Sequence, residues 1–572
     1  MNKDTDNKET VDISTDSCYD RFMRACAEYT TRNAVYFKGK YYSYSDLASE
    51  IDTVASALIA LGHKKGDFLT MMLPDTVQVP VFLYACSKIG MVLSVPRYES
   101  TTVEILMAMK TCQSKTLVIA DSKIEGNEQI FDSKSLENII ICTSGKVLSI
   151  AARYRISQIS KTKNVRVLKY KQFLKSGLVT DGKLGEEISK ADCKTDVLCL
   201  HTGGASGIPL PTMFSCDKLN QIQENALETL GLTEKNVKFG FSSFSCLGPE
   251  YACDISFSLH GMLCCGITVI MNPFDEIKRS AYLIRMLKPQ ILVGFPNFYT
   301  KLSETAVLNE ADLSFLTNVL SVGVNFESFD RSEFNEFLKE RGFRGVVQET
   351  YHITEALSFV SLTSKNGDKP ESIGLPVPDT KIEIIDSKTD SICITGTSGE
   401  ICIYTESHMN GYYGNAKVSS EILQRRKDGR IWIHTGDIGH KDKEGYVYFE
   451  YMKKRCININ GKSIYPSPIE NIIKKLYGVE DAVVTSEDDP EYPGEKRLVA
   501  YILPEENYFA DNEKLEKLRQ GILHECELLL MPSRRPKEIY YRAYFPKNRW
   551  GMVEYDKFLK PTERLGEKIN RS

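Results

Sequence analysis

The stretch HTGGASGIPLPTMFS, residues 201–215, combines residue types that can bind phosphate through neutral hydrogen-bond donors. Three glycines allow backbone amides to approach a phosphate closely, and two hydroxyl groups add further donors. These residues are Gly203, Gly204, Gly207, Thr202 and Ser206. The stretch contains no lysine or arginine, so positive charge opposite a bound phosphate must come from elsewhere. The pattern predicts a nucleotide-phosphate loop, with an ordinary glycine-rich turn as the alternative.

The stretch is not a P-loop of the Walker type, because that loop ends in Gly-Lys-Ser or Gly-Lys-Thr. Pro209 and Pro211 would also obstruct a helix that began directly after the glycines, since proline lacks the amide hydrogen. The preceding run DVLCL is short and apolar, as expected of a buried strand. We therefore expect a strand that leads into a phosphate loop without an immediate helix.

Other segments follow in a fixed order along the chain. They are LKPQILVGFPNFYTKL, ETYHITEA, GEICIYTESHMNGYYGN, IWIHTGDIGHKDKEGYVYF and ININGKSIYPSPIE. Together with the loop, this order resembles the adenylate-forming superfamily, which includes acyl-CoA synthetases, adenylation domains of nonribosomal peptide synthesis and firefly luciferase. The resemblance extends from Tyr19 to Lys557. The family loop is Thr-Ser-Gly-Thr-Thr-Gly-x-Pro-Lys-Gly, and Leu210 occupies its lysine position.

The resemblance implies a role in ATP binding for each matching residue. The hydroxyl groups of Thr202 and Ser206 would bind the β- and γ-phosphates, and Thr354 would contact the α-phosphate. Tyr351 would stack on adenine, while Asp437, in HTGD, would accept hydrogen bonds from both ribose hydroxyls. Glu355 would help to hold Mg²⁺, whose charge neutralises much of the phosphate. The structural alternatives are a surface turn for ETYHITEA and a turn aspartate for Asp437.

The same resemblance places a carboxylic-acid pocket among five residues, which are Ser245, Val322, Gly323, Val324 and His352. Ser245 stands where the family usually has a histidine, and His352 replaces a glycine and adds bulk. Gly461, in NINGKS, would line the approach of a thiol after the C-terminal domain rotates about the hinge Lys454. The implied acceptor is CoA or the phosphopantetheine of an acyl carrier protein. In the Pro-x-Glu-Ile-Glu segment, Pro468 replaces a glutamate.

Three positions that are cationic in the family are apolar in this chain. Besides Leu210, Met452 replaces an arginine of the Gly-Arg-x-Lys region, and Met552 occupies the position of the catalytic lysine. Losing a preorganised donor aimed at developing charge costs about 10²- to 10³-fold in rate. Cations that a shift of one or two residues could bring into the site are Lys453, Arg455, Lys547 and Arg549. The simpler interpretation of all four is a solvated surface charge.

Three functions fit this pattern. The first is a ligase that activates a carboxylic acid with Mg-ATP and passes the acyl group to a thiol, at a reduced rate. The second is a catalytically silent pseudoenzyme that acts as a nucleotide or acyl sensor or as a protein partner. The third is a half-reaction enzyme that uses a pre-formed adenylate, for which the catalytic lysine is dispensable.

The elements that must position these residues alternate between helices and strands. Ser45 is a plausible N-cap for a helix with one apolar face that ends near Gly62. DFLTMML, VFLYACSKIG and MVLSVP then predict a βαβ unit with parallel strands. TKIEIID, GEICIYT and GYVYFEY predict a small antiparallel sheet or barrel.

The predicted fold is therefore α/β, with a large N-terminal domain of mixed α/β sheets, a small β-barrel-like part and a small mobile C-terminal α/β domain. We place a disordered tail at 1–17, the AMP-binding domain at 18–452 and the C-terminal domain at 453–572.

Composition is that of a globular protein, with 42% hydrophobic and 26% charged residues among 572. The net charge of -4 gives no reason to expect nucleic acid or an anionic membrane as a partner. The longest apolar tract, 255–271, is interrupted by His260 and Gly261 and predicts a buried helix and strand rather than a membrane span. The 16 cysteines include no Cys-x-x-Cys, so the spacing suggests no zinc site, and reduced thiols indicate a cytoplasmic location.

Overall fold

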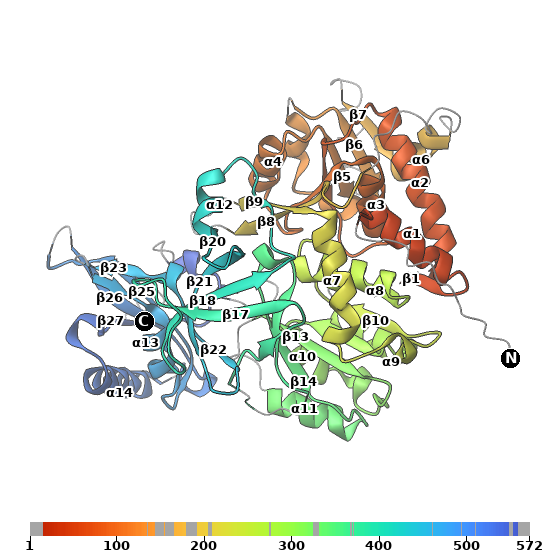
Figure 1. Ribbon diagram of the computed structural model, residues 1–572. Helices are drawn as coiled ribbons and strands as arrows, with labels where there is room; N and C mark the ends of the chain where they lie inside the picture. The colour runs from red at the N-terminus through yellow and green to blue at the C-terminus, as the bar shows by residue number, and fades with distance from the viewer. Residues whose placement is uncertain are drawn as a thin grey trace.

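A computed structural model of the chain has a mixed α/β architecture, in which two large sheets carry helices on their faces (Figure 1). It describes residues 15–133, 135–143, 154, 165–178, 191–203, 209–273, 276–323, 331–365, 369, 371–459, 462–492, 495–509, 511–547 and 553–558. The end of the predicted tail belongs to the folded chain. Ser17 is a buried N-cap of α1 (Cys18–Glu28), and Asp16 accepts two hydrogen bonds from Arg24.

One large sheet has eight strands in the order β19, β9, β8, β4, β3, β5, β6, β7. Their bounds are β3 Phe68–Met72, β4 Val92–Val95, β5 Thr116–Ala120, β6 Asn138–Cys142, β7 Arg166–Lys169, β8 Asp196–Gly203, β9 Pro209–Ser215 and β19 Gly411–Tyr412. The predicted βαβ unit is confirmed, because β3 and β4 are parallel neighbours joined through α3 (Gln78–Ile89). Both strands are fully buried, as expected in a sheet covered on two faces.

The helix before this unit, α2 (Tyr44–Ala60), begins at Ser43 rather than at the predicted Ser45. Ser43 accepts a hydrogen bond from the Asp46 amide, and the Asp46 carboxylate accepts from the Ser43 amide. This reciprocal capping box requires an acidic or amide residue three positions after the cap, and Asp46 fulfils it for Ser43.

The second large sheet has nine strands in the order β16, β15, β14, β13, β12, β10, β11, β1, β2. Their bounds are β1 Asn33–Phe37, β2 Lys40–Ser43, β10 Ser242–Ser245, β11 Thr268–Met271, β12 Ile291–Gly294, β13 Asn318–Val322, β14 Val347–His352, β15 Phe359–Leu362 and β16 Leu375–Pro376. Strands β10, β12, β13 and β14 are successive parallel neighbours. Their C-terminal ends therefore lie along one edge of the sheet, where open α/β sheets usually bind ligands.

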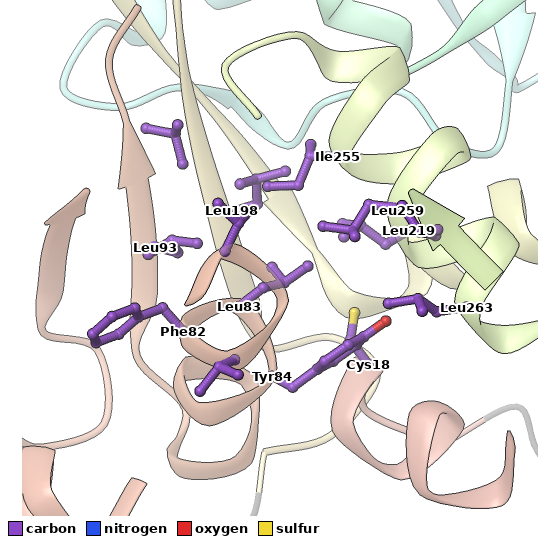
Figure 2. Close-up of a cluster of buried hydrophobic side chains, with 14 of the residues drawn as sticks. Cys18, Phe82, Leu83, Tyr84, Leu93, Leu198, Leu219, Ile255, Leu259 and Leu263 are labelled. Carbon is purple, nitrogen blue, oxygen red and sulfur yellow. The ribbon is translucent and has the colours of Figure 1, made fainter. Parts of the chain in front are cut away.

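The main hydrophobic core lies between the large sheets and their helices (Figure 2). In Figure 2, Leu93 of β4 and Leu198 of β8 lie beside the labelled side chains of α3, which are Phe82, Leu83 and Tyr84. Leu219 and Leu259 lie on the other side of α3 from Leu93 in this view. The other helices of this region are α4 Thr102–Thr111, α6 Tyr170–Leu178, α7 Cys216–Thr229, α8 Met262–Cys264, α9 Ile277–Leu287, α10 Pro296–Ser303 and α11 Arg331–Glu340.

The long apolar tract is confirmed as a buried helix and strand, formed by the π-helix η4 (Asp254–Gly261), α8 and β11. Among the helices that the structure describes, none is long and apolar enough to cross a bilayer.

The predicted small antiparallel sheet is also confirmed. Its strands are β17 Thr380–Ile385, β18 Gly399–Thr405, β20 Leu423–Arg425, β21 Ile431–Lys441 and β22 Val447–Met452, with α12 Ala416–Ile422 beside β20. The order is β17, β18, β21, β20, and β22 pairs with the far end of β21. The long strand β21 therefore contacts three partners, and it carries Asp437.

The chain after Met452 forms its own sheets, at one side of the molecule in Figure 1. Its elements are η7 Lys453–Arg455, β23 Ile457–Ile459, β24 Lys462–Ile464, α13 Pro466–Lys474, β25 Val479–Asp488, β26 Lys496–Pro504, α14 Asn512–Leu529 and β27 Glu538–Tyr541. Two hydrophobic clusters consist entirely of residues beyond η7. This separate core supports the boundary after Met452, which stays a prediction.

Candidate functional site

Three of the predicted acyl-pocket residues lie at the C-terminal ends of parallel strands in the nine-stranded sheet. Ser245 ends β10, Val322 ends β13 and His352 ends β14. Val322 is fully buried, and the next residue, Gly323, has a φ of 118° that side chains other than glycine rarely adopt. Because the strands are neighbours in one sheet, the fold gathers these residues at a single edge.

The side chain of Ser245 is engaged with a buried carboxyl group. Its hydroxyl donates to Asp254 Oδ1 at 2.5 Å, and it accepts a hydrogen bond from the Leu247 amide at 3.2 Å. The pKa of Asp254 is raised to about 7, chiefly by burial; the Ser245 hydrogen bond opposes this rise and the nearby charge of Glu250 adds to it. The position of the usual family histidine is thus occupied by a short serine held against η4.

His352 contributes a neutral imidazole to the same edge. Burial lowers the pKa of His352 to about 4, so the ring is uncharged near neutral pH. Its Nδ1 is buried and has no hydrogen-bond partner in the structure. A buried polar atom of this kind is costly unless a ligand or water satisfies it, which suits the wall of a binding pocket.

Tyr351 and Asp437, predicted to bind adenine and ribose, lie in contact. The Tyr351 hydroxyl donates to Asp437 Oδ2 at 2.6 Å, although 86 residues separate them in the chain. Burial, followed by the Asp437 charge, raises the pKa of Tyr351 well above its usual value, so the phenol stays protonated and donates. Its ring is 1% exposed and packs into the cluster beneath the small sheet.

The part of strand β21 that carries Asp437 is braced from strand β18. The Gly436 amide donates to Glu400 Oε1 at 3.0 Å, and the Asp437 amide donates to Thr435 Oγ1 at 3.0 Å. Glu400 is also 3.3 Å from His434 Nδ1. Burial raises the pKa of Glu400, but the hydrogen bond and charge of His434, with smaller contributions from Gly436 and Lys453, lower it overall. An ionised Glu400 therefore fixes the backbone directly before Asp437.

Glu355 is oriented by a second tyrosine. The Tyr412 hydroxyl donates to Glu355 Oε1 at 2.6 Å, and the Met409 amide donates to the Glu355 carbonyl at 2.8 Å. Glu355 and its neighbour Thr354 form the short 3₁₀ turn η6 (Thr354–Ala356), directly after β14. A carboxylate held in this way is a suitable hard oxygen ligand for a divalent cation.

Tyr412 also links this turn to the predicted phosphate loop. It lies in β19, which pairs with β9, and β9 is the antiparallel partner of β8. Thr202, near the end of β8, is paired with Leu210 of β9, and the Thr202 hydroxyl is 3.5 Å from the Leu210 carbonyl oxygen. The strands thus connect Thr202 with Glu355 through Tyr412.

Leu210, at the lysine position, is partly buried and packs against the main core. The side chain at this position therefore adds to the hydrophobic core and supplies no positive charge for a phosphate. Gly203 ends β8 and pairs with Pro209. The remaining loop residues predicted to bind phosphate, Gly204, Ser206 and Gly207, lie outside the described residues.

Met452, the second replaced cation, is the last residue of β22 and is paired directly with Asp437 of β21. Lys453 follows it and is exposed, as predicted. The prediction that Arg455 is a solvated surface charge is wrong. Its guanidinium bonds both Glu470 oxygens at 2.7 and 2.8 Å and lies 3.6 Å from the centre of the Tyr555 ring.

Lys547 is exposed and forms an isolated bridge with Val553. Several predicted residues fall outside the described part of the chain. They are Val324, Gly461, Arg549 and Met552, together with the side chain of Lys454.

Comparison with known proteins decides the family. A family model described as AMP-binding enzyme matches residues 22–413, which is more than half of the chain. The chain belongs to the AMP-binding enzyme family. The resemblance to adenylate-forming proteins is thereby confirmed.

Relatives with ligase names are similar over 78% to 96% of the chain. A long-chain-fatty-acid–CoA ligase of Bacillus subtilis is 24% identical, covering 96% of this chain and 93% of the relative. A probable 4-coumarate–CoA ligase of Dictyostelium discoideum is 26% identical and covers 78% of each chain. The crystal structure of an anthranilate CoA ligase in complex with anthranoyl-AMP has a TM-score of 0.74 at 16% identity, covering 97% of this chain and 98% of that one. This last likeness shows the shared fold.

Two positioning residues of this AMP-binding protein were missed by sequence reasoning. Tyr412 and Glu400 both lie inside the segment GEICIYTESHMNGYYGN, in which the sequence predicted no site residue. Both contacts join segments far apart in sequence, so no local spacing indicates them. The adjacent tyrosines Tyr412 and Tyr413, between two glycines, were the available signal for Tyr412.

Proposed function

We propose that the protein is an adenylate-forming acid–thiol ligase. It would bind Mg-ATP and a carboxylic acid, release pyrophosphate as the acyl-adenylate forms, and then transfer the acyl group to a thiol. The observation that carries this proposal is the Tyr351–Asp437 hydrogen bond at 2.6 Å, because it brings together the two residues expected to hold adenosine. The ligase names of relatives that align with nearly the full chain support the same reaction class.

The residues near the proposed phosphate site fit a magnesium-bound nucleotide. Glu355 offers a carboxylate that Tyr412 holds in place, and Thr354 and Thr202 offer hydroxyl groups. Bound Mg²⁺ would supply the positive charge that the loop lacks. Asp437 would accept the ribose hydroxyls while the protonated Tyr351 keeps its carboxylate oriented.

The proposed reaction is slow, because apolar residues occupy three positions at which the resemblance predicts cations that face phosphate or the reacting carboxylate. Leu210 packs on the core, and Met452 stands opposite Asp437. Arg455 does not compensate, because its guanidinium is committed to Glu470 in the C-terminal part. Because Met552 occupies the position of the catalytic lysine, no lysine there would neutralise the charge that develops as the adenylate forms. This loss would lower the rate about 10²- to 10³-fold.

The second half of the reaction uses the C-terminal part. In this proposal the segment after Met452 rotates about Lys454 and brings Gly461 to the thiol channel, with CoA or a carrier-protein phosphopantetheine as acceptor. The separate hydrophobic clusters of this part support such a motion, since few core contacts would have to break.

Pyrophosphate release over a panel of carboxylic acids tests the proposal. The panel includes long-chain, aryl and short-chain acids, so that it covers the acid classes that the names of the relatives specify. We expect slow, acid-dependent release that Met552→Lys accelerates and Asp437→Ala abolishes. Absence of release from both the wild-type protein and Met552→Lys, with every acid, would remove the ligase proposal.

A second candidate is a pseudoenzyme that binds nucleotide or acyl groups without turnover. The direct pairing of Met452 with Asp437 favours it, because an apolar side chain takes the place of a nucleotide-binding arginine. A third outcome, the half-reaction enzyme, predicts acyl-CoA formation from a supplied acyl-adenylate and CoA in the absence of ATP. These assays distinguish the three functions directly.

A further inference from the structure

Two cysteines, a histidine and a serine converge beside the second half of strand β8. None of these four residues has a role in the proposed ligase site. Cys199 and His201 lie two residues apart on one face of β8, Cys112 is the C-cap of α4, and Ser94 lies on β4. All four side chains are buried, with exposures of 0% for Ser94 and Cys199, 1% for Cys112 and 6% for His201. Positions 94, 112, 199 and 201 are too widely spaced for a sequence motif.

Two distances within this cluster are slightly longer than the edges of a tetrahedral zinc site. Cys112 Sγ is 3.9 Å from Cys199 Sγ, and Cys199 Sγ is 3.9 Å from His201 Nε2. The three ligand atoms all lie within 4.8 Å of one another. Zn–S bonds of about 2.3 Å and Zn–N bonds of about 2.0 Å at tetrahedral angles give edges of roughly 3.5 to 3.8 Å.

A fourth corner is also present. Ser94 Oγ is 2.9 Å from His201 Nε2 and 3.9 Å from Cys112 Sγ. Without a cation, His201 Nε2 faces both the Ser94 hydroxyl and the Cys199 thiol, which compete for it. A metal ion would accept lone pairs from both sulfur atoms and from Nε2 at once.

The chemistry of the ligands favours a thiophilic cation. Two cysteine sulfur atoms and one imidazole nitrogen form a ligand set of the kind that zinc binds in proteins. The surrounding side chains are apolar, namely Phe68, Val92 and Met213. Such a shell excludes competing water.

The other cluster of this type has a different explanation. Glu400, Cys402 and His434 also lie close together, but Glu400 already bonds the Gly436 amide and the His434 ring. Those contacts support the part of strand β21 that carries Asp437. They account for the residues without a metal.

We propose that Cys112, Cys199 and His201 bind one zinc ion, with the Ser94 hydroxyl at the fourth corner. The ion would fasten β8 to β4 and to the end of α4, one residue before Thr202. It would thus stabilise the strand that leads into the phosphate loop, without taking part in the chemistry of the substrate.

Metal analysis of the full chain tests this inference without any nucleotide or acid. The protein is purified under reducing conditions without chelator, and its zinc content is measured by mass spectrometry of the metal. Cobalt(II) is then titrated into metal-free protein, because thiolate ligands give a charge-transfer band and a tetrahedral site gives strong visible absorption. We expect about one equivalent of metal and both absorption features.

Variants assign the ligands. Cys112→Ser and His201→Gln are expected to weaken cobalt binding by more than about 100-fold, since changing even an outer partner costs 10- to 100-fold. Cys86→Ala, at a fully buried cysteine of α3, should bind like the wild type. Circular dichroism verifies that each variant is folded. If Cys112→Ser does not fold, Cys199→Ser replaces it as the ligand variant.

Three results would overturn the inference. They are a metal-free protein that shows no thiolate-to-cobalt band, equal metal binding by the wild type and folded ligand variants, and a Cys112–Cys199 disulfide detected by intact mass. Loss of binding in Cys402→Ala alone would assign the metal to the other cluster and would equally contradict it.

Discussion

Asp437 and Met452 are direct partners across the antiparallel strands β21 and β22. The carboxylate proposed to bind ribose therefore has a neutral thioether side chain at the facing position. The resemblance to the adenylate-forming superfamily predicts an arginine at position 452. In the proposed function, this pair would keep the ribose ligand while removing a nearby cation.

Restoring the cation should strengthen nucleotide binding. We expect Met452→Arg to bind ATP about tenfold more tightly, equivalent to about 1.4 kcal/mol, because a guanidinium can form charge-assisted bonds with phosphate. Met452→Gln, of similar length and no charge, is the matched control. Calorimetric titration with Mg-ATP measures both. Equal affinities for the Arg and Gln variants would contradict the assignment of position 452.

The hydroxyl of Tyr351 should matter for AMP binding through its hold on Asp437. Tyr351→Phe removes a 2.6 Å hydrogen bond but keeps the buried ring, so AMP affinity should fall about tenfold with little loss of stability. Tyr448→Phe, which removes a 3.3 Å bond to Asp442 in the turn between β21 and β22, should leave AMP affinity unchanged. If the two variants bind AMP alike, the proposed orienting role is wrong.

A buried histidine should make the stability of the fold depend on pH. His260 is fully buried between Tyr84 and Asn220, and burial lowers its pKa to about 3. The unfolded chain takes up the proton near pH 6.5, so this contribution is complete above pH 6.5 and is lost as pH falls toward 3. Between pH 7 and pH 5 the wild type should lose about 2 kcal/mol from this group.

His260→Gln should lack this part of the pH dependence, because glutamine does not titrate. Urea unfolding at both pH values measures the difference, and exposed His524→Gln is the control that should keep it. The same loss of stability in wild type and His260→Gln would show that other groups cause it.

The Arg455–Glu470 pair should hold the C-terminal part together. Its side chains are 15% and 3% exposed, and Glu470 also accepts the Val484 amide at 2.7 Å. Arg455→Leu leaves that carboxylate buried and unpaired, which costs about 3 to 5 kcal/mol. Hydrogen exchange of β25 should accelerate in this variant. Exposed Lys453→Leu should not change it.

The double variant Arg455→Leu with Glu470→Leu separates the pair from general damage. It should recover much of the protection, since no unpaired charge remains. Equal exchange in the single and double variants would show that the effect is not electrostatic.

Much of the architecture followed from local patterns. Apolar runs bounded by turn residues predicted the βαβ unit and the small antiparallel sheet, because burial imposes those periods. The start of α2 was misplaced by two residues, although Asp46, three positions after Ser43, indicated the correct cap.

The site could be predicted only in part. Ordered motifs indicated Tyr351 and Asp437 separately, but their contact depends on packing between the nine-stranded sheet and the small sheet. The pairing of Met452 with Asp437 depends on an irregularity in the β21–β22 register after Ile438. Arg455 pairs with a residue 15 positions away, through a turn and a helix that local spacing does not define.

Calorimetric titration of AMP into the wild-type protein and Asp437→Asn tests the central claim most directly, because it requires neither turnover nor knowledge of the acid. The account predicts binding to the wild type and at least about tenfold weaker binding to the folded variant, since an amide accepts ribose hydroxyls less well than a carboxylate. No binding to the folded wild type, or equal binding to both proteins, would contradict it.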